Sequence, residues 1–121
     1  MSFDEILREA CNLVPGSRVA VLMNMDGLVV ARHERQPAGV DLEAVLVEMV
    51  GALATSGQVA REVEGARFTD AVFDLGVGTL VVRMLPEDHF VAFWLGPETA
   101  SGRARWALRV LQVDLNKELA A

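Results

Sequence analysis

The stretch that decides the fold is RVAVLMNMDGLVVARHE at residues 18–34, in which an Asp-Gly step separates two apolar runs. Apolar runs rich in β-branched residues and bounded by turn residues are typical of strands. Gly27 adopts a positive φ without steric cost, and Asp26 can hydrogen-bond the local backbone, so the pair favours a hairpin turn. No second acid or metal ligand lies near Asp26 in the sequence. We therefore interpret Asp26 and Gly27 as a structural turn between strands at 18–24 and 28–34.

A helix is predicted on each side of this hairpin. Ser2 and Glu5 have the spacing of a capping box, and Pro15-Gly16 ends the helix that they begin. Asp41 is the expected N-cap of a second helix at about 42–60. The apolar part of this second helix spans more than half of its circumference, which is more than a one-sided surface helix needs. Its apolar residues form two adjacent stripes, namely Leu42, Val45, Leu46, Met49 and Leu53, and beside them Val47, Val50 and Ala54.

The second half of the chain predicts three more strands and a closing helix. The strands lie at 66–75, 78–85 and 89–95, with short links between them, and the helix covers about 100–119. The order is therefore α-β-β-α-β-β-β-α. We expect one α+β domain over residues 1–121 with an antiparallel sheet.

Composition excludes several classes of function. Residues 1–100 contain 15 acids and 7 bases, and this acidic body argues against nucleic acid as a partner. Charged residues interrupt the apolar runs, and the N-terminus lacks a signal-peptide pattern, so we expect a cytoplasmic protein without membrane insertion. The single cysteine, Cys11, is interpreted as a core residue. No Cys/His cluster has metal-ligand spacing, so no metal is expected.

No catalytic centre is predicted. His33 and His89 could serve as general bases, but no Ser or Cys nucleophile has a recognisable setting near them. The glycines at 76–78 lack the Lys and the strand-to-helix order of a phosphate-binding loop. We therefore expect no enzyme activity of its own and no cofactor.

Two surfaces are instead predicted to bind proteins. On the second helix, Val47, Val50 and Ala54 flank a patch of small residues that lets another backbone approach closely, unless loops of the same chain cover it. The patch consists of Ala44, Gly51 and Thr55, with Glu48 among them. On the closing helix, an aromatic and arginine surface lies opposite the core stripe, unless the first helix packs against that side. This second surface consists of Arg103, Trp106, Val110 and Val113, with Lys117 beside them.

Taken together, the order of elements resembles the Roadblock/dynein light chain family over nearly the whole chain. Four segments carry the resemblance: VPGSRVAVLMNMDGLVVA (14–31), GARFTDAVFDLGVGTLVVRML (65–85), HFVAFWLG (89–96) and GRARWALRV (102–110). The resemblance implies a five-stranded antiparallel sheet with the second helix on one face and the first and last helices on the other.

The resemblance also implies a function. Family members form homodimers by pairing the 66–75 strand across a two-fold axis, which implies an interface that contains Val47, Val50, Ala54, Phe68, Asp70 and Val72. It implies a small Ras-like GTPase bound over Ala44, Glu48, Gly51 and Thr55, with its nucleotide state biased by differential binding. Arg61 and Arg67 carry no motif of a catalytic arginine. Almost nothing follows the last helix, unlike in the longer gliding-type regulators, so binding of a GTPase is a firmer expectation than its activation. The alternative is a small-ligand sensor with a pocket between helix and sheet.

Overall fold

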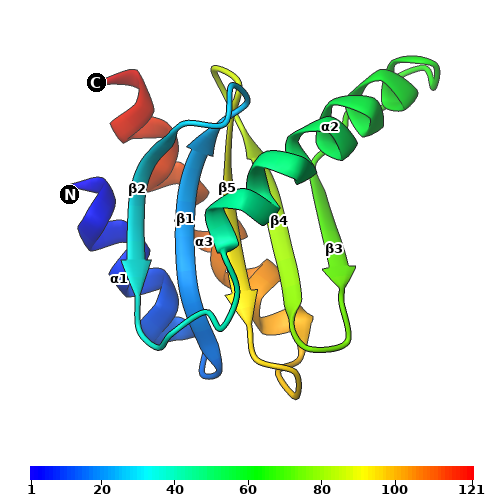
Figure 1. Ribbon diagram of the computed structural model, residues 1–121. Helices are drawn as coiled ribbons and strands as arrows, with labels where there is room; N and C mark the ends of the chain where they lie inside the picture. Colours follow the sequence, from blue (N-terminus) through cyan, green and yellow to red (C-terminus); the bar gives the residue numbers. More distant parts are fainter.

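The computed structural model describes residues 1–121 and contains one five-stranded antiparallel sheet with three helices (Figure 1). The strand order in the sheet is β2-β1-β5-β4-β3. The predicted fold class and order of elements are therefore confirmed. The elements are α1 (Phe3–Leu13), β1 (Ser17–Asn24), β2 (Val29–Glu34), α2 (Leu42–Arg61), β3 (Asp70–Asp74), β4 (Thr79–Leu85), β5 (His89–Leu95) and α3 (Ser101–Ala120).

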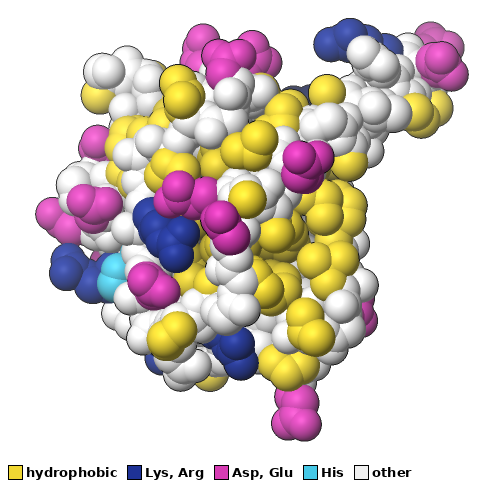
Figure 2. Space-filling view, in the orientation of Figure 1, with side chains coloured by type: hydrophobic (Ala, Val, Ile, Leu, Met, Phe, Trp, Pro, Cys, Tyr) yellow, Lys and Arg dark blue, Asp and Glu magenta, His cyan; other side chains and the backbone are white.

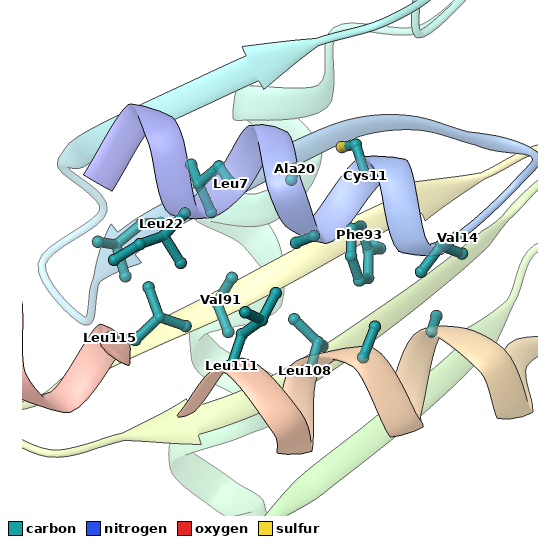
Figure 3. Packing of buried hydrophobic residues seen from close by; sticks show 14 of the residues in the cluster. Leu7, Cys11, Val14, Ala20, Leu22, Val91, Phe93, Leu108, Leu111 and Leu115 are labelled. Atoms are coloured by element: carbon teal, nitrogen blue, oxygen red, sulfur yellow. The ribbon is translucent and has the colours of Figure 1, made fainter. Parts of the chain in front are cut away.

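The helices form two layers around the sheet. α1 and α3 lie side by side on one face, and α2 crosses the other (Figure 1). The α1–α3 side holds a core of 18 buried residues, which include Leu7 of α1, Leu108 of α3 and Phe93 of β5 (Figure 3). The α2 side holds a smaller core of 12 buried residues. Both cores bury apolar area, but the second one has only a single helix to cover it.

Cys11 belongs to the larger core, as predicted. Its side chain is fully buried among the residues of α1, α3 and the sheet (Figure 3). Burial raises the pKa of the Cys11 thiol, and this effect exceeds the opposite influences of the Ser17 hydroxyl and the Arg35 charge. Cys11 is therefore a protonated core residue at neutral pH.

The hairpin at Asp26-Gly27 is confirmed, but a different residue holds it. Gly27 has a φ of +85°, as such a turn requires. The side-chain oxygen of Asn24 accepts hydrogen bonds from the backbone N–H of Asp26 at 3.0 Å and from that of Leu28 at 3.1 Å. The Asp26 side chain is exposed and bonds no protein group. The stabilising role expected of Asp26 thus belongs to Asn24.

β3 is shorter than the predicted strand at 66–75. After α2 the chain makes a tight turn in which Ala66 N–H donates to the Val63 carbonyl at 3.0 Å, with Gly65 at a φ of +76°. The ladder proper begins only at Asp70, although the Thr69 carbonyl already accepts from Met84 N–H at 2.8 Å. Residues 66–69, which the apolar pattern assigned to the strand, instead connect this turn to the ladder without regular strand pairing. β3 pairs only with β4 and is an edge of the sheet.

Candidate functional site

The outstanding surface of the molecule is α2. Only three of its twenty residues are buried, namely Leu42, Leu46 and Leu53. Its C-terminal part projects beyond the edge of the sheet (Figure 1). A helix of this composition normally buries a broad stripe, so its exposure indicates a surface that another molecule covers.

By length and composition, α2 could also cross a membrane. Only 17% of its most apolar 18-residue stretch is buried in the structure. The interruptions noted in the sequence therefore do not exclude a membrane span. The helix nevertheless carries Glu43 and Glu48, and its Leu42, Leu46 and Leu53 pack on the sheet. Those contacts bury part of the apolar surface of α2, and contact with a second protein would bury the rest.

The predicted patch of small residues on α2 lies in the open. Ala44, Glu48, Gly51 and Thr55 are all exposed, so no loop of the same chain covers them. A Cβ added at Gly51 would meet no atom within 4 Å. The structure brings these four residues together on the outward side of the helix, as their spacing predicts.

The stripe of Val47, Val50 and Ala54 is less uniform than its spacing suggests. Val47 is half exposed and lies above the β1–β2 turn, where a Cβ at Gly27 would approach its Cγ2 to 3.4 Å. Val50 is partly buried against the α2-side core. Ala54 is exposed and lines a groove. The structure therefore places these three residues in three different surroundings along one side of α2.

The sequence predicted a pocket between helix and sheet only under the alternative interpretation as a ligand sensor, and it did not predict which residues line this groove. The groove has a volume of about 600 Å³ and lies between the C-terminal half of α2 and the segment that leads into β3. The small side chains Ala54, Gly57 and Ala60 leave this space, which is the one signal the sequence offers. Its lining consists of Met25, Leu53, Ala54, Gly57, Gln58, Ala60, Arg61, Ala66, Arg67, Phe68, Met84 and Asp88.

The β3 edge completes this surface. Val72 is exposed, whereas Phe68 and Phe73 are partly buried against the α2-side core. Hydrophobic side chains gather beside α2 and down the edge of the molecule where β3 lies (Figure 2). We call the α2-facing residues Val50, Ala54, Phe68 and Phe73, together with the free edge strand β3, the α2–β3 surface. Val72 of this strand lies opposite Val81 of the α1–α3-side core, so its side chain is on the other face of the sheet edge. The α2–β3 surface combines exposed apolar area with an unpaired strand edge, which is the composition of a pairing surface.

Asp70, the remaining predicted interface residue, points toward α3. Its Oδ2 accepts a hydrogen bond from Arg105 Nε at 3.0 Å. Desolvation is the largest single influence on the Asp70 pKa and raises it. The hydrogen bonds from Arg105 and Thr69 and the charges of Arg105 and Arg83 together outweigh it, so the pKa lies below its ordinary value. Asp70 thus fixes β3 to α3 within the protomer.

The surface predicted on α3 is also exposed. Trp106, Val110 and Val113 expose 44%, 49% and 60% of their area, so α1 does not cover them. The Arg103 guanidinium lies 4.5 Å from the centre of the Trp106 ring. This surface lies on the sheet face opposite to α2 (Figure 1).

No group of three or more His, Cys, Asp or Glu side chains lies close enough to hold a metal ion. His33 and His89 lie on β2 and β5, which are separated by β1. The exposed surfaces of α2, β3 and α3 are the features that remain to be explained by function.

Comparison with known proteins agrees with this geometry. The chain is similar to a Roadblock/LC7 domain from Streptomyces avermitilis, with 19% identity, a TM-score of 0.83 and all of both chains covered. It is similar to the gliding protein MglB from Thermus thermophilus, with 22% identity and a TM-score of 0.81 over 94% of this chain and 85% of that one. An MglB in a tetrameric arrangement gives 21% identity and a TM-score of 0.82 over the same shares.

No curated protein matches the chain significantly. At these identities the solved structures show the fold alone. The family model for the Roadblock/LC7 domain, however, matches residues 3–90, which is well over half of the chain. The chain therefore belongs to the Roadblock/LC7 family.

Proposed function

We propose that the protein is a non-catalytic homodimeric regulator or scaffold that binds a small Ras-like GTPase and biases its nucleotide state. The observation that carries this proposal is the exposure of α2 next to the free edge of β3. These two features give one protomer a surface for a second copy and a further surface for a partner.

The α2–β3 surface is the proposed dimer interface. Antiparallel pairing of two β3 edges would satisfy their free backbone groups and join two sheets into one. The projecting end of α2 would then lie over the neighbouring sheet and cover apolar side chains such as Phe68 and Phe73. The tetrameric arrangement of an MglB of the same fold supports self-association.

The dimer is tested by sedimentation equilibrium of Val72→Arg. Val72 is 41% exposed at the edge strand β3, and Val30 is 42% exposed at the opposite edge strand β2, so Val30→Arg is a matched control. We expect Val72→Arg to be a folded monomer because it places a charge in the interface, whereas Val30→Arg stays dimeric. Equal self-association of both variants and the wild type would exclude β3 as the interface.

The outward patch of Ala44, Glu48, Gly51 and Thr55 is the proposed GTPase surface. Small side chains let a second backbone approach closely, and Glu48 supplies one charge for orientation. A surface without a catalytic group can still change the nucleotide state of a GTPase if it binds the GTP and GDP conformations with different affinity.

The GTPase surface is tested with immobilised protein in lysate of the source organism, supplemented with GDP or a non-hydrolysable GTP analogue. Gly51→Arg should lose a GTPase that the wild type retains in one nucleotide state. Gly51 and Gly102 both lie in helices with open space around them, so Gly102→Arg on the opposite face is the control. If Gly51→Arg still retains the GTPase, the outward patch of α2 is not the surface that binds it.

The groove of about 600 Å³ supports a second candidate, the small-ligand sensor, because its volume lies in the range of ligand pockets. A thermal-shift screen of nucleotides and metabolites tests it. Stabilisation that disappears in Ala54→Trp, which fills the groove, would favour the sensor. If the dimer forms as proposed, the groove lies beside its interface and Ala54→Trp weakens dimerisation instead.

A further inference from the structure

The outer face of α3 carries an apolar stripe with a positively charged border. Trp106, Val110 and Val113 follow one another at helical spacings of four and three residues, so their side chains share one side of the helix. Arg103, Arg109 and Lys117 lie on the same side, all exposed. We call these six residues the α3 stripe. It spans about 21 Å, or four helical turns.

The cations of the α3 stripe are available to a partner. Arg109 and Lys117 form no ion pair, in contrast to Arg105, which binds Asp70. The stripe thus carries cations without a salt-bridge partner on a protein whose net charge is −6, and only Lys117 shares a small pocket with the acids Asp114 and Glu118 of α3. An acidic partner would gain favourable charge interactions here, and a basic one would not.

Trp106 is held in place before any partner arrives. Arg103 Nε donates a hydrogen bond to the Leu13 carbonyl at the end of α1 at 2.8 Å, and its guanidinium stacks over the indole. Tryptophan and arginine are enriched at the sites that contribute most to protein binding. A fixed aromatic side chain also loses less conformational entropy on binding than a mobile one.

We propose that the α3 stripe docks an acidic amphipathic helix of a partner protein. Apolar side chains of that helix contact Trp106, Val110 and Val113, and its Asp and Glu residues pair with Arg109 and Lys117. The length of the stripe accommodates about 14 residues of partner helix. This surface is independent of the proposed GTPase surface, which lies on the other side of the sheet.

The neighbouring helix α1 favours a protein helix over a membrane. A basic helix with an exposed Trp is also typical of anionic membrane surfaces. However, α1 lies beside α3 on the same face and exposes Asp4, Glu5 and Glu9 (Figure 1). A flat anionic bilayer that reached the stripe would also meet these acids, whereas a narrow helix touches α3 alone.

The proposal is tested by selecting peptides against the full chain from a displayed library of helical peptides with random sequence. We expect enrichment of peptides with acidic residues on both sides of an apolar stripe. Trp106→Ala and Arg109→Glu should each weaken their binding about tenfold or more. Arg8→Glu makes the same charge change on the exposed face of α1 and should leave binding unchanged. Gly51→Arg should also leave it unchanged, whatever its effect on a GTPase.

Four outcomes would overturn the proposal. In the first, no peptides are enriched, and in the second, the enriched peptides lack acidic residues. In the third, the peptides bind Trp106→Ala as well as the wild type. In the fourth, phosphatidylserine vesicles bind the chain through Arg109 and Lys117 while no peptide does. Circular dichroism of Trp106→Ala separates loss of binding from loss of fold. Because Trp106 is half exposed, we expect that variant to fold.

Discussion

Gly78 packs directly against the indole of Trp94. A Cβ at Gly78 would overlap two ring carbons of Trp94 and approach the Leu95 carbonyl to 2.9 Å. Trp94 Nε1 also donates a hydrogen bond to the Ala38 carbonyl at 2.8 Å. One buried tryptophan on β5 therefore holds both the β3–β4 turn and the loop that leads into α2, the two segments that position the α2–β3 surface.

Gly78→Ala should therefore destabilise the fold. The added methyl group forces the indole or the β3–β4 turn to move, at a cost of about 1–3 kcal/mol in the free energy of unfolding. Urea unfolding followed by far-UV circular dichroism measures it. Gly102→Ala is the control, because its Cβ would meet no atom within 4 Å. A Gly78→Ala variant as stable as the wild type would show that the contact relaxes without cost.

Asn24→Ala should destabilise the first hairpin more than Asp26→Ala does. Asn24 accepts two backbone hydrogen bonds in the turn, whereas the side chain of Asp26 accepts none. We expect Asn24→Ala to cost about 1–2 kcal/mol and Asp26→Ala less than about 0.5 kcal/mol, measured as free energies of unfolding in urea. If Asp26→Ala instead destabilises the protein more than Asn24→Ala, Asp26 stabilises the turn as the sequence suggests.

The comparison of these two residues illustrates what sequence patterns can predict. The Asp-Gly step locates the turn because glycine is needed for a positive φ there. It does not identify the residue that bonds the turn, since Asn24 lies in the strand by pattern. The start of β3 was predicted wrongly for a related reason. Residues 66–69 are compatible with a strand by pattern, but in the structure they only connect the turn after α2 to the ladder that begins at Asp70.

Contacts between residues far apart in the sequence could not be predicted from its patterns. The carbonyls at the end of α1 accept hydrogen bonds from Arg35, which follows β2, and from Arg103 of α3. The apolar spacing of α2 predicted that it needs more cover than one sheet face gives. Only the structure shows that no loop supplies this cover, and that Asp70 binds Arg105 of α3.

Cys11 should react slowly with thiol reagents in the folded protein. Its side chain is fully buried, and burial raises its pKa, so the reactive thiolate is both scarce and shielded at pH 8. We expect labelling by a disulfide reagent at pH 8 to follow unfolding as urea is added. A Ser2→Cys substitution in a Cys11→Ala background supplies an exposed cysteine that labels at once. Equally fast labelling of Cys11 without urea would indicate local opening of α1.

Asp70 should make folding stability depend on pH in the acid range. Its folded pKa lies below its ordinary value of 3.8, so the ionised form is stabilised in the folded state. The contribution is complete above the unfolded pKa, near 4, and is lost as the pH falls through the lowered folded pKa. Because Arg105 is largely exposed, we expect the contribution to reach no more than about 1 kcal/mol.

The matched variant is Asp70→Asn, which resembles the protonated aspartic acid in shape and charge. Urea unfolding of the wild type and of Asp70→Asn between pH 7 and pH 2 should give a difference in stability that is constant at neutral pH. This difference should shrink toward zero below pH 4, because the wild-type side chain then becomes uncharged as well. A difference that persists unchanged at the lowest pH would mean that Asp70 stabilises β3 through packing or through its hydrogen bond with Thr69. The attraction between the Asp70 carboxylate and the Arg105 guanidinium would then contribute nothing to the attachment of the edge strand.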